Sequence, residues 1–288
     1  MITVSVIIPV YNGKSTLGRA VMSVVNEPQV SEILIIDDGS TDGSDIIAED
    51  YSNKYTNIRF LHHPNRENKG AAASRNLGLA NASSDWIQFL DADDELLKGK
   101  LSGQINMISP ELALIIGNSI HVFPDGRKHL RKADIDMWKG LIRSKLGDTC
   151  ANLWRKEFLV KVGGWDERLS SSQEYDMMFR LVSSFPNVVF DNRYLTLIHK
   201  SENSISTHPL RKVQRIKNWI DLRQRIRVFL IRNNAFGLKN KYNWSGAVGL
   251  FCDVNEVKYP SEINRFFYGI YKMEIDIKQK LHQIIKAK

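Results

Sequence analysis

The chain has 288 residues, of which 43% are apolar and 25% are charged, so its composition excludes disordered, collagen-like and low-complexity proteins. This length predicts one large domain or two smaller ones, able to bury a core without a disulfide or a structural metal. The two cysteines, Cys150 and Cys252, lack zinc-ligand spacing and fit a reducing compartment.

The N-terminal apolar run lacks a basic start and is interrupted by Ser5 and Pro9, which predicts a strand rather than a signal peptide. No apolar run approaches the ~20 residues of a membrane-spanning helix. We therefore expect a cytoplasmic protein that is not integral to a membrane.

The formal net charge of +8 is spread unevenly. Residues 209–288 hold 17 basic and 6 acidic residues, whereas the first 208 residues carry a small negative charge. This asymmetry predicts a nearly neutral body with a basic appendage that meets an anionic partner. The basic segment 211–232 leaves three interpretations open: a helix on a membrane surface, a site for an anionic acceptor, or a packed helix with a solvated basic face.

Short β-branched runs alternate with helical patterns over the first ~100 residues, which is typical of βαβ units and a mostly parallel sheet. The expected strands cover residues 5–10, 32–37, 58–63 and 85–90. We expect one helix capped by Ser15, a second capped by Ser40 or Thr41 that ends near Tyr55, and a third over residues 71–80.

Polar residues follow three of these strands, starting at Tyr11, Asp37 and Asp91. Because ligands of open α/β sheets bind outside the carboxyl ends of the strands, we expect these residues to share one edge. Asp91 and Asp93 directly follow a buried strand, where two carboxylates repel each other and favour a cation.

Other carboxylates at this edge have simpler interpretations. Asp37 and Asp42 are expected to be turn residues, since aspartate is favoured there for local hydrogen bonding. Asp94 and Glu95 are expected to start a helix, where negative charge suits the helix dipole.

The second part of the chain has a different pattern. Expected strands cover residues 111–118, 119–123, 187–191 and 194–199. A helix is expected over residues 173–185, and amphipathic helices beyond Pro209.

Six motifs occur in one order over the first ~205 residues: PVYNG, DDGSTDGS, ENKGAAASRNLG, FLDADD, VGGWDE and SSQEYDMMFRL. This ordered set resembles the family 2 glycosyltransferases, which are inverting enzymes. The resemblance implies an α/β GT-A fold, with a Rossmann-like, mostly parallel sheet flanked by helices. It implies a catalytic domain over 1–208, with a nucleotide-binding half (1–100) and an acceptor half (101–208), followed by a helical basic region over 209–288.

The resemblance also implies a UDP-sugar donor held with Mn²⁺ or Mg²⁺. Asp38 would accept the N3–H of uracil, because a carboxylate is an acceptor only. Asp91 would accept from the ribose hydroxyls, while Asp93 and His199 would lie at the metal and the diphosphate. The remaining nucleotide-sugar contacts would come from Pro9, Val10, Tyr11, Arg75 and Ala92.

The acceptor hydroxyl must lose a proton as it attacks the anomeric carbon, so a carboxylate is expected to act as general base. Where the family commonly shows Glu-Asp, this chain has Gln173-Glu174, so the base is assigned to Glu174, with Asp176 as a second candidate. Trp165 is either a core residue or a platform for an acceptor sugar, and the sequence leaves both open.

These residues together predict metal-dependent, inverting transfer of a sugar from a UDP-sugar to a hydroxyl of a glycan. The acceptor is expected to be a cell-surface polysaccharide or a lipid-linked oligosaccharide, with peripheral contact at an anionic inner membrane face as an alternative role of the basic region. A sugar-1-phosphate nucleotidyltransferase would need a Gly-rich phosphate loop after the first strand, which PVYNGKS does not supply. A nucleic-acid-binding module is disfavoured, because the basic residues lie outside the sheet region and no matching motif occurs.

Overall fold

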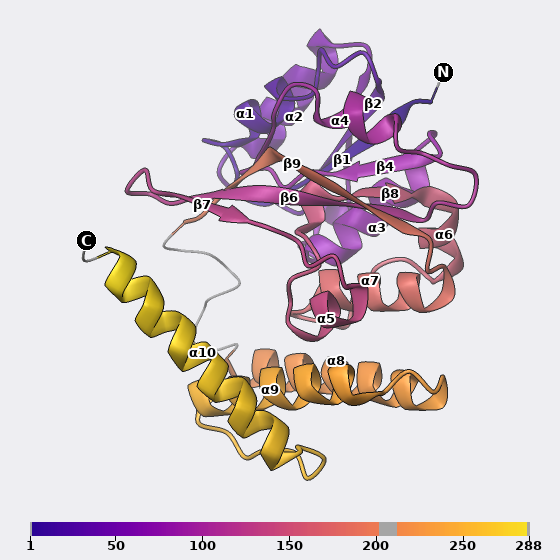
Figure 1. The fold of residues 1–288 in the computed structure, drawn as a ribbon. Helices are drawn as coiled ribbons and strands as arrows, with labels where there is room; N and C mark the ends of the chain where they lie inside the picture. The colour runs from indigo at the N-terminus through magenta and orange to yellow at the C-terminus, as the bar shows by residue number, and fades with distance from the viewer. Residues whose placement is uncertain (1, 202–211, 287–288) are drawn as a thin grey trace. The chain divides into compact units, whose positions relative to one another are not determined.

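The computed structural model describes residues 2–201 and 212–286, which form two compact units. The first unit contains the residues up to Ala133 and those from Leu146 to the gap. The second contains Asp134–Lys145 and the residues after the gap (Figure 1). The expected domain boundary at 208/209 lies outside the described residues.

A nine-stranded sheet forms the centre of the first unit, in the order β3-β2-β1-β4-β8-β6-β9-β5, with β7 paired to β6. Its strands are β1 (Val4–Val10), β2 (Val30–Asp37), β3 (Ile58–His62), β4 (Trp86–Phe89), β5 (Glu95–Leu96), β6 (Leu114–Val122), β7 (Lys128–Arg131), β8 (Leu153–Arg155) and β9 (Val188–His199). Strands β3, β2, β1 and β4 are parallel, as their βαβ pattern predicts. The pairs β4–β8, β6–β8, β6–β7 and β5–β9 are antiparallel, while β6–β9 is parallel.

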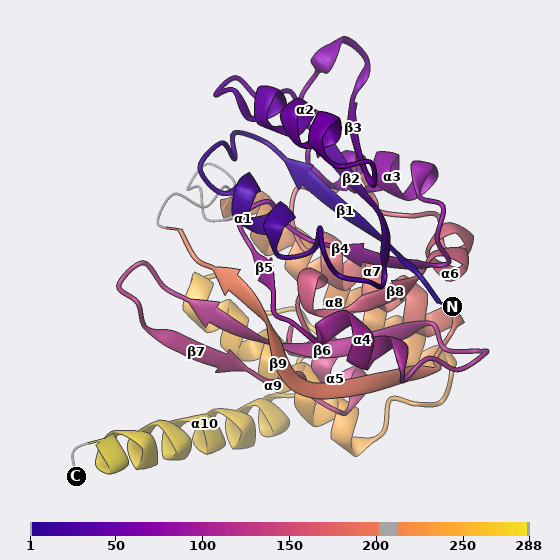
Figure 2. The same cartoon turned by 90° about the horizontal axis from the view of Figure 1, so that it is seen from above.

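Helices cover the sheet (Figures 1 and 2). They are α1 (Leu17–Met22), α2 (Ser44–Lys54), α3 (Ala71–Asn81), α4 (Lys100–Ile105), α6 (Lys156–Lys161) and α7 (Gln173–Ser184), with 3₁₀ turns at Pro64–Arg66 and Thr149–Ala151. Every position of β1 is buried, as expected for a strand with helices on both sides. Helix α3 approaches β1 closely at Gly78, where a Cβ atom would lie 2.4 Å from Ile7.

Several predicted boundaries are wrong. Helix α1 begins after Thr16 rather than Ser15, and α2 begins after Gly43, at φ +90°, rather than after Ser40 or Thr41. The Thr41 N–H instead donates to Asn12 Oδ1 at 2.8 Å, so the loop after β2 binds the loop after β1 before its helix starts.

The strands of the second part also differ from expectation. Residues 114–122 form one continuous strand, β6, instead of two, and β9 likewise runs without a break through residues 188–199. Glu95 begins the short strand β5, which pairs with β9, so the expectation that Asp94 and Glu95 start a helix is wrong.

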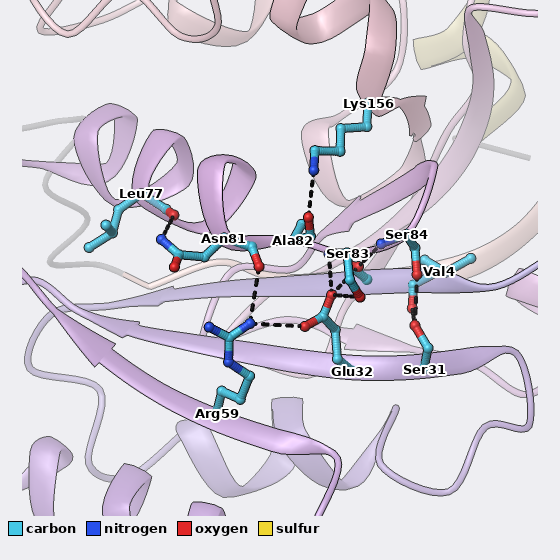
Figure 3. A network of polar contacts seen from close by, with 11 residues as sticks. Val4, Ser31, Glu32, Arg59, Leu77, Asn81, Ala82, Ser83, Ser84 and Lys156 are labelled. Carbon is cyan, nitrogen blue, oxygen red and sulfur yellow. Dashed lines mark hydrogen bonds and ion pairs between the residues drawn. The ribbon is translucent and has the colours of Figure 1, made fainter.

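A buried carboxylate ties the first strands together near the start of β2 (Figure 3). Glu32 accepts hydrogen bonds from Ser5 Oγ at 2.6 Å and from the backbone N–H and hydroxyl of Ser83, and it pairs with Arg59 at 3.3 Å. Burial alone would raise the pKa of Glu32, but these donors outweigh it and lower the pKa below its usual value. The network fixes the strand starts, away from the polar edge of the sheet.

The second unit is helical. It contains α5 (Met137–Ile142), α8 (Lys212–Arg232), α9 (Leu238–Asn255) and α10 (Arg265–Lys286). Arg223 is fully buried, donates to the Leu141 and Ile142 carbonyls and lies 3.9 Å from the ring of Trp219. No helix within residues 2–201 and 212–286 combines the length and apolar character needed to cross a membrane.

Candidate active site at the carboxyl edge of the sheet

The loops after β1 and β2 meet at the carboxyl edge of the parallel strands. The Asp38 N–H donates to the Val10 carbonyl at 2.8 Å, and the Asn12 N–H donates to Ser40 Oγ at 3.0 Å. Asp37 accepts from the backbone N–H groups of Gly39 and Ser40, which confirms its predicted role as a turn residue. The predicted polar residues therefore do share one edge.

Asp38 is buried at this edge. Its carboxylate accepts from the backbone N–H of Lys69 at 2.7 Å and of Gly70 at 2.9 Å, and it lies 3.6 Å from His63 Nε2. Each carboxylate oxygen has two lone pairs, so these backbone bonds leave Asp38 capacity for a further donor. Gly39, at φ +75°, makes the turn possible, since a Cβ there would lie 2.6 Å from the Arg66 carbonyl.

The expected nucleoside wall lies beside this turn. Val10 is 1% exposed and Pro9 is buried in β1, whereas Tyr11 is 42% exposed and Ala92 lies at the edge of the core. Of these residues, Tyr11 thus offers the most accessible surface to a bound molecule.

The acidic motif after β4, which consists of Asp91, Asp93 and Asp94, is held by an ion pair and by a thiol. Arg75, on α3, lies 2.6 Å from Asp91 Oδ1, and the Asp91 N–H donates to Cys150 Sγ at 3.2 Å. The Arg75 guanidinium lies 4.8 Å from the ring of Trp165. The structure therefore brings Arg75 and Asp91, each predicted separately to contact the nucleotide-sugar, into direct contact.

Burial and mutual repulsion perturb the other carboxylates of this motif. Burial, followed by the charges of Asp91 and Asp93, raises the pKa of Asp94 to about 8. Burial and the Asp91 charge also raise the pKa of Asp93. Carboxylates that repel each other in this way favour a bound cation, which would relieve their mutual repulsion.

The donor set fits a hard divalent cation. Ligand atoms of Asp91, Asp94 and Cys150 all lie within 4.8 Å of one another. Carboxylate oxygens are the ligands that Mg²⁺ and Mn²⁺ prefer, whereas the Cys150 thiol is buried, which raises its pKa well above the usual value and disfavours the thiolate. The carboxylates of Asp91, Asp93 and Asp94 are thus the residues that could hold the metal.

His199 ends β9 beside this motif. Its backbone N–H donates to Asp94 Oδ1 at 2.9 Å, and its Nε2 lies 2.7 Å from Glu95, which also pairs with Arg19 at 3.3 Å. The structure therefore brings the predicted His199 to the acidic motif through β5–β9 pairing. The sequence analysis did not assign Glu95, Arg19 or Cys150 to the site.

Glu174 lies in the first turn of α7. Burial has the largest effect on its pKa and raises it, as do the charges of Asp148 and Asp91, while the charges of Arg75 and Arg131 lower it. The Asp91–Arg75 pair and Glu174 thus share one electrostatic environment.

Asp176, the second candidate base, is engaged elsewhere. Its side chain is 2% exposed and pairs with Arg180 at 2.8 Å, and Arg180 also donates to the Val162 carbonyl. This pairing anchors α7 to the residues that follow α6. It favours Glu174 over Asp176 as the carboxylate available to a substrate.

Trp165 is 2% exposed and packs edge-on against Phe89 at 5.2 Å between ring centroids. Asn76 fixes its backbone by accepting from the Trp165 N–H and donating to the Trp165 carbonyl. Of the two interpretations that the sequence left open, these contacts favour a core residue over an acceptor platform.

The start of α7 is tied to the segment before β8. The Tyr175 hydroxyl donates to the Gly147 carbonyl at 3.2 Å and accepts from the Leu146 N–H. Asp148 accepts from Ser119 Oγ at 2.5 Å and pairs with Arg131 at 3.1 Å. The segment from Leu146 to Cys150 therefore contacts both α7 and the acidic motif.

The chain is similar to known proteins over much of its length. Glycosyl transferase family 2 matches residues 5–163. An uncharacterized glycosyltransferase of Haemophilus influenzae is 39% identical over 117 residues, which are 40% of this chain and 46% of that protein. The pre-mycofactocin glycosyltransferase of Mycobacterium tuberculosis is 29% identical over 192 residues, which cover 63% of this chain and 39% of that protein. The chain thus spans less than half of the length of either relative.

Solved structures share the fold at low sequence identity. Staphylococcus aureus TarS 1-349 in complex with UDP-GlcNAc has a TM-score of 0.62 at 19% identity, covering 92% of this chain and 83% of that one. The mannosyltransferase PcManGT of Pyrobaculum calidifontis, in complex with GDP-Man and Mn²⁺, has a TM-score of 0.60 at 13% identity, covering 94% and 84%. The chain therefore belongs to glycosyl transferase family 2, and its α/β unit has the fold of the GT-A-type glycosyltransferases.

Proposed function

We propose that this transferase moves a sugar from a UDP-sugar to a hydroxyl of a glycan, with the help of a divalent cation and with inversion at the anomeric carbon. The observation that carries the proposal is the acidic motif of Asp91, Asp93 and Asp94, which lies in one electrostatic environment with Arg75 and Glu174.

Three residues are assigned to the nucleotide. Asp38 accepts the N3–H of uracil, Asp91 accepts from the ribose, and Arg75 both orients Asp91 and adds positive charge beside the nucleotide. Support for a uridine nucleotide comes from the TarS complexes with UDP and UDP-GlcNAc, whereas PcManGT holds GDP-Man. Competition between UDP and GDP for this chain decides between them.

Asp93, with His199 beside the diphosphate, is assigned to the cation. A bound Mn²⁺ or Mg²⁺ would neutralise the diphosphate leaving group as the glycosidic bond breaks. The carboxylates of this motif repel a diphosphate when no cation is present, so they make donor binding depend on the metal.

Glu174 is assigned the proton of the acceptor. As the acceptor oxygen bonds to the anomeric carbon, the bond from that carbon to the diphosphate oxygen breaks and the hydroxyl proton moves to the Glu174 carboxylate. Attack on the face opposite the leaving group inverts the anomeric centre. A carboxylate whose pKa is raised is a stronger base than an ordinary glutamate and suits this role.

Calorimetric titration of UDP, with Mn²⁺ or with EDTA, tests the donor site. We expect Asp93→Ala to weaken UDP binding in Mn²⁺ by at least about tenfold, and EDTA to remove the difference from wild type. Glu157→Ala, which removes an exposed carboxylate on α6, is the matched control and keeps wild-type affinity. Equal UDP affinity of all three proteins in Mn²⁺ and in EDTA would remove the metal role.

We extend the proposal to the second unit, whose helix α8 exposes Lys212, Lys217 and Arg232. These cations suit peripheral contact with the anionic inner face of a membrane, where a lipid-linked acceptor lies. Lys212→Gln/Lys217→Gln should reduce co-sedimentation with phosphatidylglycerol vesicles and leave UDP affinity unchanged. Unchanged co-sedimentation would instead favour a solvated basic face.

A further inference from the structure

The hairpin of β6 and β7 carries a concentration of positive charge that the proposed mechanism does not use. Between Phe123 and Lys132 it holds four cationic residues, Arg127, Lys128, Arg131 and Lys132, against a single acid, Asp125, which pairs with Arg127. Residues 124–130 and Lys132 are exposed. In Figures 1 and 2 the hairpin projects beyond the neighbouring strands of the first unit.

Strand register places part of this charge on one face. Arg131 pairs with Ser119 and His129 pairs with His121, so these four side chains point to the same side of the two strands. Asp148 confirms the shared side, because it contacts Ser119, His121 and Arg131 at 2.5, 3.1 and 3.1 Å.

This face begins at α7, the helix that carries Glu174. Arg131 Nη2 donates to the Tyr175 hydroxyl at 3.1 Å, and Tyr175 directly follows Glu174 in α7. The Arg131 charge also acts on the Glu174 carboxyl. Polar and cationic side chains therefore run from the proposed base outward along this face. Lys128, which pairs with Val122, points to the opposite face, so the hairpin carries cations on both faces.

The other border of the hairpin lies at the acidic motif. Val122, at the end of β6, pairs with His199, and the Val122 carbonyl accepts from the N–H of exposed Lys200. A molecule lying along the hairpin would thus extend away from the place where His199 and Glu174 meet the donor.

We propose that the β6–β7 hairpin binds the anionic part of the acceptor, a glycan chain that carries phosphate or carboxylate groups. This inference rests on the proposed function, since it takes the hydroxyl beside Glu174 and the charges on the hairpin to belong to one molecule. Guanidinium and ammonium groups bind phosphate and carboxylate through charge-assisted hydrogen bonds.

The hairpin suits a polar chain better than a lipid surface. Among residues 123–132, all of them described, Leu130 is the one large apolar side chain that is mostly exposed, at 57%. Interfacial membrane binding needs an apolar face as well as cations.

The test compares two variants of the full chain that lose the same charge. Arg127→Gln/Lys128→Gln removes two cations from the hairpin tip, of which Arg127 pairs with Asp125 at 2.5 Å. Lys54→Gln/Lys161→Gln removes two exposed cations from α2 and α6. Affinity for inorganic polyphosphate is measured by calorimetry at low ionic strength, with UDP affinity measured on the same samples.

We expect the hairpin variant to bind polyphosphate more weakly by up to about fivefold per cation removed, and the control variant to match wild type. Acetylation of lysines, followed by mass spectrometry, supplies a local readout: polyphosphate should protect Lys128 and Lys132 more than Lys54 and Lys161. This readout holds even where the basic second unit also binds polyphosphate.

Equal loss of affinity in both variants, or equal protection of all four lysines, overturns the proposal. So does a loss of binding to phosphatidylglycerol vesicles with polyphosphate binding unchanged, which would assign the hairpin to a lipid surface. Unchanged UDP affinity in every protein shows that the donor site is intact. Failure of wild type to bind UDP in Mn²⁺ would instead contradict the proposed function, independently of the hairpin result.

Discussion

Replacing Glu174 by Gln tests the chemical step directly, because it removes the carboxylate and keeps the shape of the side chain. A positioned general base contributes about 10²- to 10⁴-fold in rate, which corresponds to about 3 to 5.5 kcal/mol of transition-state stabilisation. We expect kcat to fall by this factor in Glu174→Gln, with UDP affinity unchanged, since the residues assigned to the nucleotide lie at Asp38, Arg75 and Asp91.

The pH dependence of kcat gives a second test of the assignment of Glu174. Burial first, then the charges of Asp148 and Asp91, raise the pKa of Glu174 above the ordinary glutamate value of 4.5. The base works only when deprotonated, so the wild-type rate should fall with decreasing pH through a pKa above 4.5. Glu174→Gln has no such group, and its residual rate should lack this limb.

The assay is steady-state UDP release from a UDP-sugar that binds, with and without an acceptor, for wild type and three variants. Glu157→Gln, on the exposed face of α6, controls for loss of a carboxylate and should behave as wild type. Asp176→Asn should lose about 3 kcal/mol of stability, since it breaks a buried ion pair with Arg180, while the folded fraction keeps its kcat. Full kcat in Glu174→Gln together with collapse in Asp176→Asn would refute our assignment of the base.

Three further predictions concern stability and the donor. Glu32→Gln should lower the free energy of unfolding by about 2 to 3 kcal/mol in urea at neutral pH. Because the pKa of Glu32 is lowered in the folded state, this stabilisation should fade as the pH falls below about 4.5. A difference between wild type and variant that stays constant down to pH 3 would contradict this prediction. Lys100 is buried, which lowers its pKa from 10.5 to about 7, so the folded state holds fewer protons than the unfolded state between these values. Wild-type stability should therefore gain relative to Lys100→Met as the pH rises from 7 to 10, and parallel curves would exclude this. Asp38→Asn should weaken UDP binding in calorimetry, because an amide can present a donor to the uracil N–H, and stronger protection of wild type by GDP than by UDP would contradict the uridine assignment.

The parallel strands were predictable because each one is a short segment rich in apolar residues that is followed by polar residues. The fully buried β1 shows this pattern in its strongest form. Helix starts were less predictable, since several side chains near Ser40 can cap a helix and the choice depends on distant partners. Asn12, almost thirty residues earlier in the chain, binds the Thr41 N–H and delays the helix to Ser44.

The same limit applies to the candidate site. Its carboxylates are local in sequence, so Asp91 and Asp93 could be singled out from the strand that precedes them. Cys150 meets Asp91 across 59 positions, and Arg131 meets Tyr175 across 44. Neither contact leaves a periodic pattern, and strand register alone brings Glu95 to His199.

Each of the two units contains one cysteine, and both thiols are free and buried. Cys150 lies in the first unit against the acidic motif, and Cys252 lies in the second unit on α9. A thiol reacts as the thiolate, and burial raises the pKa of both groups, so alkylation must await local opening. Mass spectrometry of the two alkylated peptides would therefore measure the rate of local opening of each unit separately, in the wild-type chain. Slower alkylation of Cys150 when UDP and Mn²⁺ are added, with Cys252 unaffected, would report donor binding without any enzymatic assay.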